Sequence, residues 1–222
     1  MCGRIGLTEL SWRQLVAVLR AELAPEHEQL FRPRYNLAPT QDAWICREVA
    51  DRRQLIPARW GFPSHAAHNI INARAETAAT AKSFKQAFLD RRCVIPVSGF
   101  FEWTRDGRHQ PYWFTASDDG APLLLAGLYR EGTYGLNFVI ITTAANDAIR
   151  PIHHRMPAVL SVDAAEAWLE RADETLLKRA PEGALRFHAV SRKVNTAGFE
   201  GPECIAPKAN GGGPVQLGLK LS

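Results

Sequence analysis

Short apolar runs separated by turn-prone stretches are the feature that most restricts the fold of this chain. The four clearest runs have six to eight residues, and turn-prone stretches such as TRDGRHQ and SDDGA lie between them. Runs of this length are typical of buried strands and are far too short to cross a bilayer. They predict largely antiparallel strands at 93–100, 111–116, 122–129 and 137–144, with further β-type segments at 43–48, 55–61, 69–73, 157–161 and 188–191.

Helical patterns lie between these strands and indicate an α+β protein. Asp163 and Glu166 have the spacing of a capping box, and Asp173 is expected to cap a further helix. The stretch 32–41 contains two prolines and predicts an extended loop. The expected helices cover 11–23, which Pro25 ends, 82–92 and 164–171.

Length and composition favour one globular domain of 222 residues with a sizeable core. The first residues carry no secretory signal, so we expect the protein to remain in the cytoplasm. The four cysteines form no C-x-x-C pair, and the histidines at 65 and 68 have no cysteine nearby, so we expect no metal and no cofactor. The net charge of +4 is compatible with nucleic acid but is a weak signal by itself.

Cys2 is the first candidate for chemistry, because removal of Met1 would make it the terminal residue. A terminal cysteine carries an α-amine with a pKa of about 7.7–8.0 beside a thiol near 8.5. With an aldehyde, the amine can form a Schiff base and the thiol can then close a thiazolidine ring. An abasic deoxyribose in its open form presents such an aldehyde. The same residue would also suit an N-terminal-nucleophile amidase, and an incidental buried thiol is the plain alternative.

Three further segments contain candidate acid–base and binding groups. Glu102 stands between two aromatic residues, where desolvation would raise its pKa, although a solvated strand face is equally compatible with the pattern. His153 and His154 precede an expected strand, at a position where binding residues often gather. In the segment 70–77, Asn72, Arg74 and Glu76 alternate and would share one face if the segment is extended.

Cations and aromatic residues that could serve a single nucleic-acid strand are scattered along the chain. Guanidinium groups can grip phosphates, and aromatic rings offer stacking faces to bases. None of these residues decides the function when taken alone. The candidates are Arg4, Arg34, Arg74, Arg155, Trp60, Phe62 and Trp103.

Nine segments taken in order give a much stronger signal. They are MCGR, RPRYNLAPT, RWGF, INARAET, CVIPVSGFFEW, LAGLY, FVIITTAAN, IHHRMPAVL and HAVSRKVN. Together they resemble the motif series of the SRAP family, also called SOS response-associated peptidases or abasic site processing proteins. The resemblance extends from residue 1 to about 205.

The resemblance implies a single compact α+β domain, 1–205, with a curved, barrel-like, mostly antiparallel β core and peripheral helices, followed by a flexible tail, 206–222. It implies that Cys2 is the nucleophile, that Asn72 positions its amine, that Glu102 transfers protons, and that His153 is the histidine of the I-H-x-R-x-P pattern. His154 falls at the variable position of that pattern. DNA contacts are implied for Arg4, Arg74 and Arg155, and for Trp60 and Phe62 in RWGF.

The implied function is covalent capture of abasic sites in single-stranded DNA through a thiazolidine at Cys2, during the response to DNA damage. The family's proposed hydrolase or peptidase activity would be limited to removal of Met1 and self-release, with a lyase reaction as a further activity. We expect a monomer, associated with the nucleoid and not with a membrane. Pro63 departs from relatives that carry a tryptophan there as a wedge against duplex, which leaves junction preference open.

Two other functions remain open at this point. An N-terminal-nucleophile cysteine amidase or peptidase would turn over an amide and form no stable DNA adduct. A non-covalent single-stranded DNA-binding module would show salt-sensitive binding that depends neither on abasic sites nor on Cys2.

Overall fold

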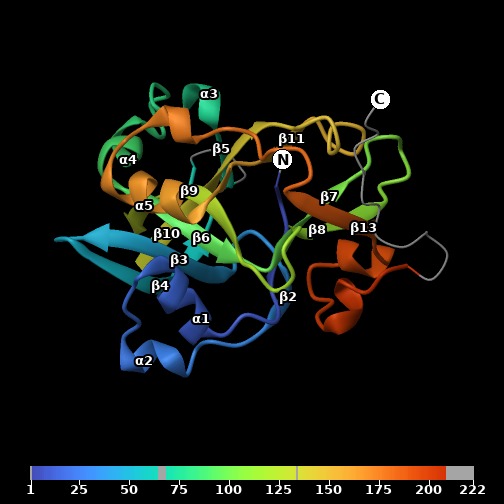
Figure 1. Ribbon diagram of the computed structural model, residues 1–222, viewed down its shortest axis with the longest axis horizontal. Helices are drawn as coiled ribbons and strands as arrows, with labels where there is room; N and C mark the ends of the chain where they lie inside the picture. Colours follow the sequence, from blue (N-terminus) through green and yellow to red (C-terminus); the bar gives the residue numbers. More distant parts are fainter. Residues whose placement is uncertain (1, 65–68, 134, 209–222) are drawn as a thin grey trace.

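The computed structural model describes residues 2–64, 69–133 and 135–208 (Figure 1). Strands dominate this part of the chain and form two sheets. The first sheet has the order β13-β8-β7-β1-β2, and all its pairings are antiparallel. Its strands are β1 (Ile5–Leu7), β2 (Arg34–Leu37), β7 (Gly99–Trp103), β8 (Pro111–Ala116) and β13 (Leu185–Ala189).

The second sheet closes on itself. β10 pairs in parallel with β4 on one side and antiparallel with β9 on the other, so β4, β3, β6, β9 and β10 form a closed ring of strands. The expected barrel-like, mostly antiparallel core is therefore confirmed. Its strands are β3 (Asp42–Val49), β4 (Arg52–Trp60), β5 (Asn72–Arg74), β6 (Arg92–Val97), β9 (Leu123–Gly132), β10 (Gly135–Ala144), β11 (Arg155–Pro157) and β12 (Val159–Leu160).

The period-two alternation of the strands of the second sheet divides their side chains between two of the three hydrophobic clusters among the described residues. On β3, Ile45 belongs to the core shared with the first sheet, while its neighbour Cys46 belongs to the core under the helices. Val139 and Ile140 of β10 divide in the same way. Figure 1 shows the helices around the ring of strands and the first sheet on the other side. The helices are α1 (Trp12–Leu19), α2 (Pro25–Glu28), α3 (Ala75–Ala78), α4 (Lys85–Asp90) and α5 (Val162–Glu170), with short 3-10 turns η1 (Glu174–Leu176), η2 (Arg192–Asn195) and η3 (Pro202–Cys204).

Several local predictions need correction. The first helix ends earlier than expected, because Arg20 adopts a left-handed conformation, and Pro25 begins α2 instead of closing α1. The residue that caps α5 is Ser161, whose hydroxyl accepts from the backbone of Ala164 at 3.2 Å, so the capping box at Asp163 is wrong. Asp173 does cap η1, as predicted.

The predicted loop at 32–41 contains β2, which pairs with β1. Pro33 and Pro39 lie outside this four-residue strand and so remove none of its hydrogen bonds. The packed chain also continues past residue 205, since Pro207 forms a bridge with Val190. The rest of the expected tail, 209–222, lies outside the described residues, as do the histidines at 65 and 68.

Candidate functional site

Four separate parts of the chain meet where the two sheets adjoin. Cys2 precedes β1, which pairs with β7, the strand that carries Glu102. Asn72 begins β5, and His153 lies just before β11; both of these strands pair with β10 of the second sheet. The start of the chain accordingly lies beside β7 and β11 in Figure 1. The four predicted catalytic residues are thus brought to one seam of the fold.

Asn72 links the two sheets at Cys2. Its Nδ2 donates a 2.8 Å hydrogen bond to the backbone carbonyl of Cys2, which fixes where the first residues run. Its Oδ1 is buried and accepts no hydrogen bond from the described residues. A buried amide oxygen of this kind is an acceptor for an N–H that enters the site.

Glu102 is almost completely buried, with 2% of its surface exposed. Burial raises its pKa to about 7, because the charged form loses its hydration. The pattern alone left a solvated face open for this residue, and the structure excludes that alternative. A carboxyl that titrates near neutrality can both donate and accept a proton during a reaction.

His153 faces this carboxyl across 3.8 Å, measured from its Nδ1 to Glu102 Oε2. The same nitrogen lies 3.1 Å from the backbone nitrogen of Arg155 and 2.9 Å from its carbonyl oxygen, so the main chain of β11 orients the ring. Burial lowers the pKa of His153 to about 4. The imidazole is therefore neutral at physiological pH.

The Cys2 side chain is fully buried, and burial together with the nearby charge of Glu102 raises the pKa of its thiol. Burial does not set Cys2 apart, because Cys46, Cys93 and Cys204 are buried as well. What distinguishes Cys2 is its neighbours, Asn72 and Glu102. In the printed chain its nitrogen is an amide, so chemistry at this nitrogen requires removal of Met1.

The three arginines predicted to contact phosphate differ in whether their guanidinium groups already have partners. The guanidinium of Arg4 donates to Asn36 Oδ1 at 2.5 Å and to the carbonyl of Val194 at 2.8 Å. That of Arg155 forms a two-pronged pair with Glu76, at 2.5 and 2.9 Å. Arg74 is exposed. Within the part of the chain that the structure describes, Arg74 is the one of the three that can receive a phosphate without breaking an existing contact.

Glu76 corrects the prediction of a single extended face. β5 ends at Arg74 and α3 begins at the next residue, so Glu76 sits in a helical turn and reaches across to Arg155. The hydrogen bonds from Arg155 lower the pKa of Glu76.

The two aromatic residues of RWGF are not exposed stacking faces, which overturns that part of the prediction. Trp60 and Phe62 are both fully buried. Trp60 stacks on Phe138 at a centroid distance of 6.0 Å, because β4 pairs with β10 at this point. Trp103 is only half-buried, and its indole nitrogen donates to Asn195 Oδ1 at 2.7 Å.

The sequence reasoning missed Asn36, Arg105 and the role of His154. Asn36 is fully buried in the motif RPRYNLAPT, and its Nδ2 contacts the carbonyls of Val194, Thr196 and Phe199. Its position as a polar residue within RPRYNLAPT is the signal that could have indicated this structural role. Arg105 lies in an exposed turn and gave no signal.

The hollow between β1 and β3, about 270 Å³ in volume, lies away from this seam and is lined by Leu37, Trp44, Pro57 and Pro96 among others. It contains none of the four residues at the seam. Within the described ranges, no three histidine, cysteine, aspartate or glutamate side chains gather as metal ligands would.

Residues 1–197 match the family described as SOS response associated peptidase (SRAP). The chain belongs to the SRAP family. It is 30% identical to the abasic site processing protein YedK of Escherichia coli, over 93% of this chain and 100% of that protein. It is 31% identical to the abasic site processing protein HMCES of Gallus gallus, over 81% of this chain and 68% of that one.

Solved structures support the fold of this SRAP domain. A crystal structure of a protein from Bacteroides thetaiotaomicron superposes with a TM-score of 0.72 at 21% identity, over 93% of this chain and all of that one. A phage-related protein from Bordetella bronchiseptica has a TM-score of 0.69 at 28% identity, over 86% of this chain and 95% of that one. Among the described residues, no helix has the length and apolar character needed to span a membrane.

Proposed function

We propose that this SRAP protein processes abasic sites in single-stranded DNA by linking Cys2, freed of Met1, to the ring-opened sugar. The observation that carries the proposal is the meeting of Cys2 with Asn72, Glu102 and His153 at one seam, from four distant parts of the chain. The names of the relatives in E. coli and Gallus gallus support abasic DNA as the substrate.

The first step is attack of the Cys2 amine on the C1′ aldehyde. The carbinolamine that forms loses water to give an imine, and this loss requires a proton on the leaving oxygen. Glu102 can supply that proton, because its pKa of about 7 leaves about half of it protonated near neutrality. Asn72 Oδ1, buried and without a partner among the described residues, can accept a hydrogen bond from the amine.

The second step closes the ring. The Cys2 sulfur adds to the imine carbon, a C–S bond forms, and the thiol proton passes to the nitrogen. The raised pKa of the thiol keeps it protonated until a base is close, and the Glu102 carboxylate can act as that base. His153, neutral at physiological pH, would hydrogen-bond the sugar oxygen and assist ring opening.

DNA would approach over the exposed rim of this seam. Arg74 is the available phosphate contact, while Arg4 and Arg155 would order the surface or exchange their present partners for phosphate. Trp103, half-buried beside Arg4, can offer a stacking face to a base. We further propose that the protein acts as a monomer on nucleoid DNA in the cytoplasm. We assign removal of Met1 and self-release as its peptidase-type reactions, with lyase action at the abasic site a secondary one.

The test uses single-stranded DNA with one abasic site, mixed with protein whose N-terminal mass has been measured. We expect a band on a denaturing gel that is stable without borohydride. Cys2→Ser keeps the amine and loses the sulfur, so it should give a band only after borohydride reduction. Cys204→Ala, which removes another buried thiol, serves as the matched control and should behave as wild type.

A Cys2→Ser protein that still formed the borohydride-independent band would overturn the thiazolidine assignment. Turnover of an amide with no adduct would favour the N-terminal-nucleophile amidase. Salt-sensitive binding that ignored the abasic site would favour a plain binding module.

A further inference from the structure

We propose that Arg105 and His154 form a positioning pair that covers His153 and holds its ring in the orientation the reaction uses. This inference rests on the proposed function for its consequence in catalysis. Arg105 and His154 are exposed residues outside the four predicted catalytic positions. They lie on different segments, Arg105 in the connection between β7 and β8 and His154 in the approach to β11.

The contact between them fixes the proton of His154. Arg105 Nη1 lies 2.8 Å from Nδ1 of His154. A guanidinium has only N–H donors, so Nδ1 of His154 must be the acceptor and the ring proton must reside on Nε2. Burial and the charge of Arg105 both lower the pKa of His154, in keeping with an acceptor at Nδ1.

The ring of His154 then packs against His153. Their centroids are 4.6 Å apart, with the planes tilted by 38°. The other constraint on His153 is the main chain of Arg155 at its Nδ1. His154 on the ring and the backbone at Nδ1 therefore limit its rotation from two directions.

The titratable and polar groups that face His153 come from every element around it. Glu102 approaches from β7, Arg105 from the following loop, and the His154 ring and the Arg155 backbone from its own segment. After trimming, the amine of Cys2 adds a further group. The hydrogen bond to the Arg155 backbone favours the imidazolium, whereas burial, His154 and the charge of Arg105 oppose it. Loss of the cover or of the Arg105 charge should therefore move the titration of His153 upward toward its ordinary value.

The experiment is an NMR titration of the histidine Cε1–H resonances from pH 3.5 to 8, with His153 assigned from the spectrum of His153→Gln. Wild type should titrate at His153 near pH 4. His154→Ala uncovers the ring, and we expect the midpoint to rise by about one pH unit or more. Arg105→Ala should raise it less, because the ring of His154 remains.

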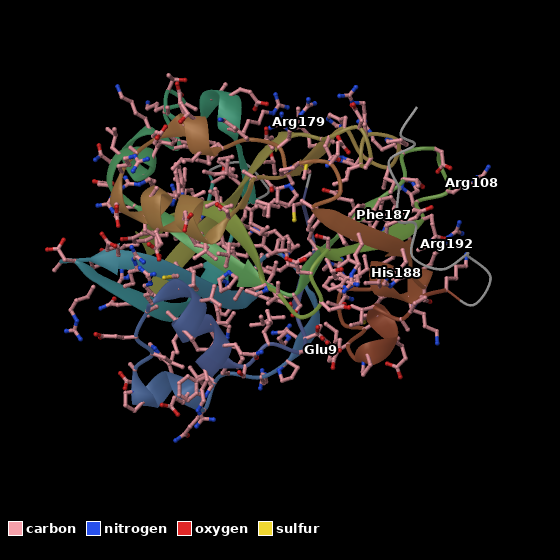
Figure 2. All side chains as sticks on the ribbon, in the orientation of Figure 1. Glu9, Arg108, Arg179, Phe187, His188 and Arg192 are labelled. Carbon is pink, nitrogen blue, oxygen red and sulfur yellow. The ribbon has the colours of Figure 1, made fainter. Side chains whose placement is uncertain are left out.

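Two variants separate the effect of the His154 ring over His153 from the effect of the Arg105 charge. His154→Phe keeps a ring against His153 but loses the acceptor, so the midpoint should stay low. Arg105→Lys keeps the cation and should rescue the Arg105→Ala effect. Arg108→Ala is the matched control from the same loop: it points away from the body of the molecule in Figure 2 and pairs with Asp106.

The proposal is overturned if His154→Ala and Arg105→Ala leave the His153 midpoint unchanged, or if Arg108→Ala moves it as much. The same proteins are then assayed for adduct formation between pH 5 and 8, where His154→Ala should displace the pH profile and Arg108→Ala should not. Because the titration needs no DNA, absence of the adduct would count against the proposed function alone. An unchanged midpoint would count against the pair alone.

Discussion

We expect Glu102→Gln to abolish adduct formation with abasic DNA and, at neutral pH, to raise the free energy of unfolding. The carboxyl has a pKa of about 7 in the folded protein, against an ordinary value of 4.5. Each pKa unit corresponds to about 1.4 kcal/mol, so ionised Glu102 costs the fold up to roughly 3 kcal/mol. Glutamine has nearly the same shape and carries no charge at any pH.

The sign follows from where the proton is held. Below pH 4.5 the carboxyl is neutral in both the folded and the unfolded protein, so it does not lower the free energy of unfolding. As the pH rises from 4.5 through about 7, the unfolded chain releases its proton while the folded protein keeps it, so the stability contribution falls. The stability advantage of Glu102→Gln over wild type should therefore grow by up to roughly 3 kcal/mol between pH 4.5 and 8.

Urea unfolding at several pH values, with both proteins at the same N-terminal mass, measures this difference. The change of this difference with pH is the test, because a constant difference in the free energy of unfolding reflects only how well the glutamine amide packs. Glu76→Gln is the matched control: Arg155 lowers the pKa of Glu76, so its contribution is lost only below pH 4.5 and should stay flat over this window. A Glu102→Gln advantage that stays constant within about 0.5 kcal/mol would refute the account of a desolvated carboxyl.

Three other substitutions test the surroundings of the site. Asn36→Leu removes a hydrogen-bond partner of Arg4 and of the backbone carbonyls of Val194, Thr196 and Phe199, and should cost roughly 2–4 kcal/mol in chemical denaturation. Phe62→Ala should cost about 3–5 kcal/mol by the same measurement, and its effect on DNA binding at low temperature should be small because the ring is buried. Arg74→Ala should weaken binding to any single strand in fluorescence anisotropy and reduce the salt slope by about one.

Most of the strands were predictable from local pattern, whereas the burial of Glu102 was not. Glu102 is flanked by aromatic residues within one strand, but a solvated face fits the same pattern. Its burial depends on Cys2 and His153, which come from distant parts of the chain. The strand at 34–37 was missed because two prolines nearby indicated a loop. Their positions outside the strand, and its pairing with residues near position 5, could not be read locally.

The prediction that Trp60 and Phe62 are exposed was wrong for a related reason. Trp60 ends β4 and Phe62 lies two residues later, in a motif that resembles a DNA-facing loop, so the pattern favours accessible rings. Their burial is decided by pairing with Phe138, far along the sequence, and by Arg130, whose guanidinium covers the ring of Phe62 at 4.2 Å. Long-range closure of the barrel therefore overrides the local signal.

The pair Glu102 and His153 has its usual protonation order reversed, and the seam between the sheets explains why. A carboxyl and an imidazole at 3.8 Å in water would form an ion pair near neutral pH, which would fix both protons. Burial raises the pKa of the acid to about 7 and lowers that of the base to about 4, so near neutral pH the imidazole is neutral and about half of the carboxyl keeps its proton. A neutral carboxylic acid can give a proton to a leaving hydroxyl and regain one from a thiol, which an ion-paired carboxylate cannot do. Cys2 precedes β1 and lies at this buried seam, where the burial that raises the pKa of its thiol also raises the pKa of Glu102 beside it.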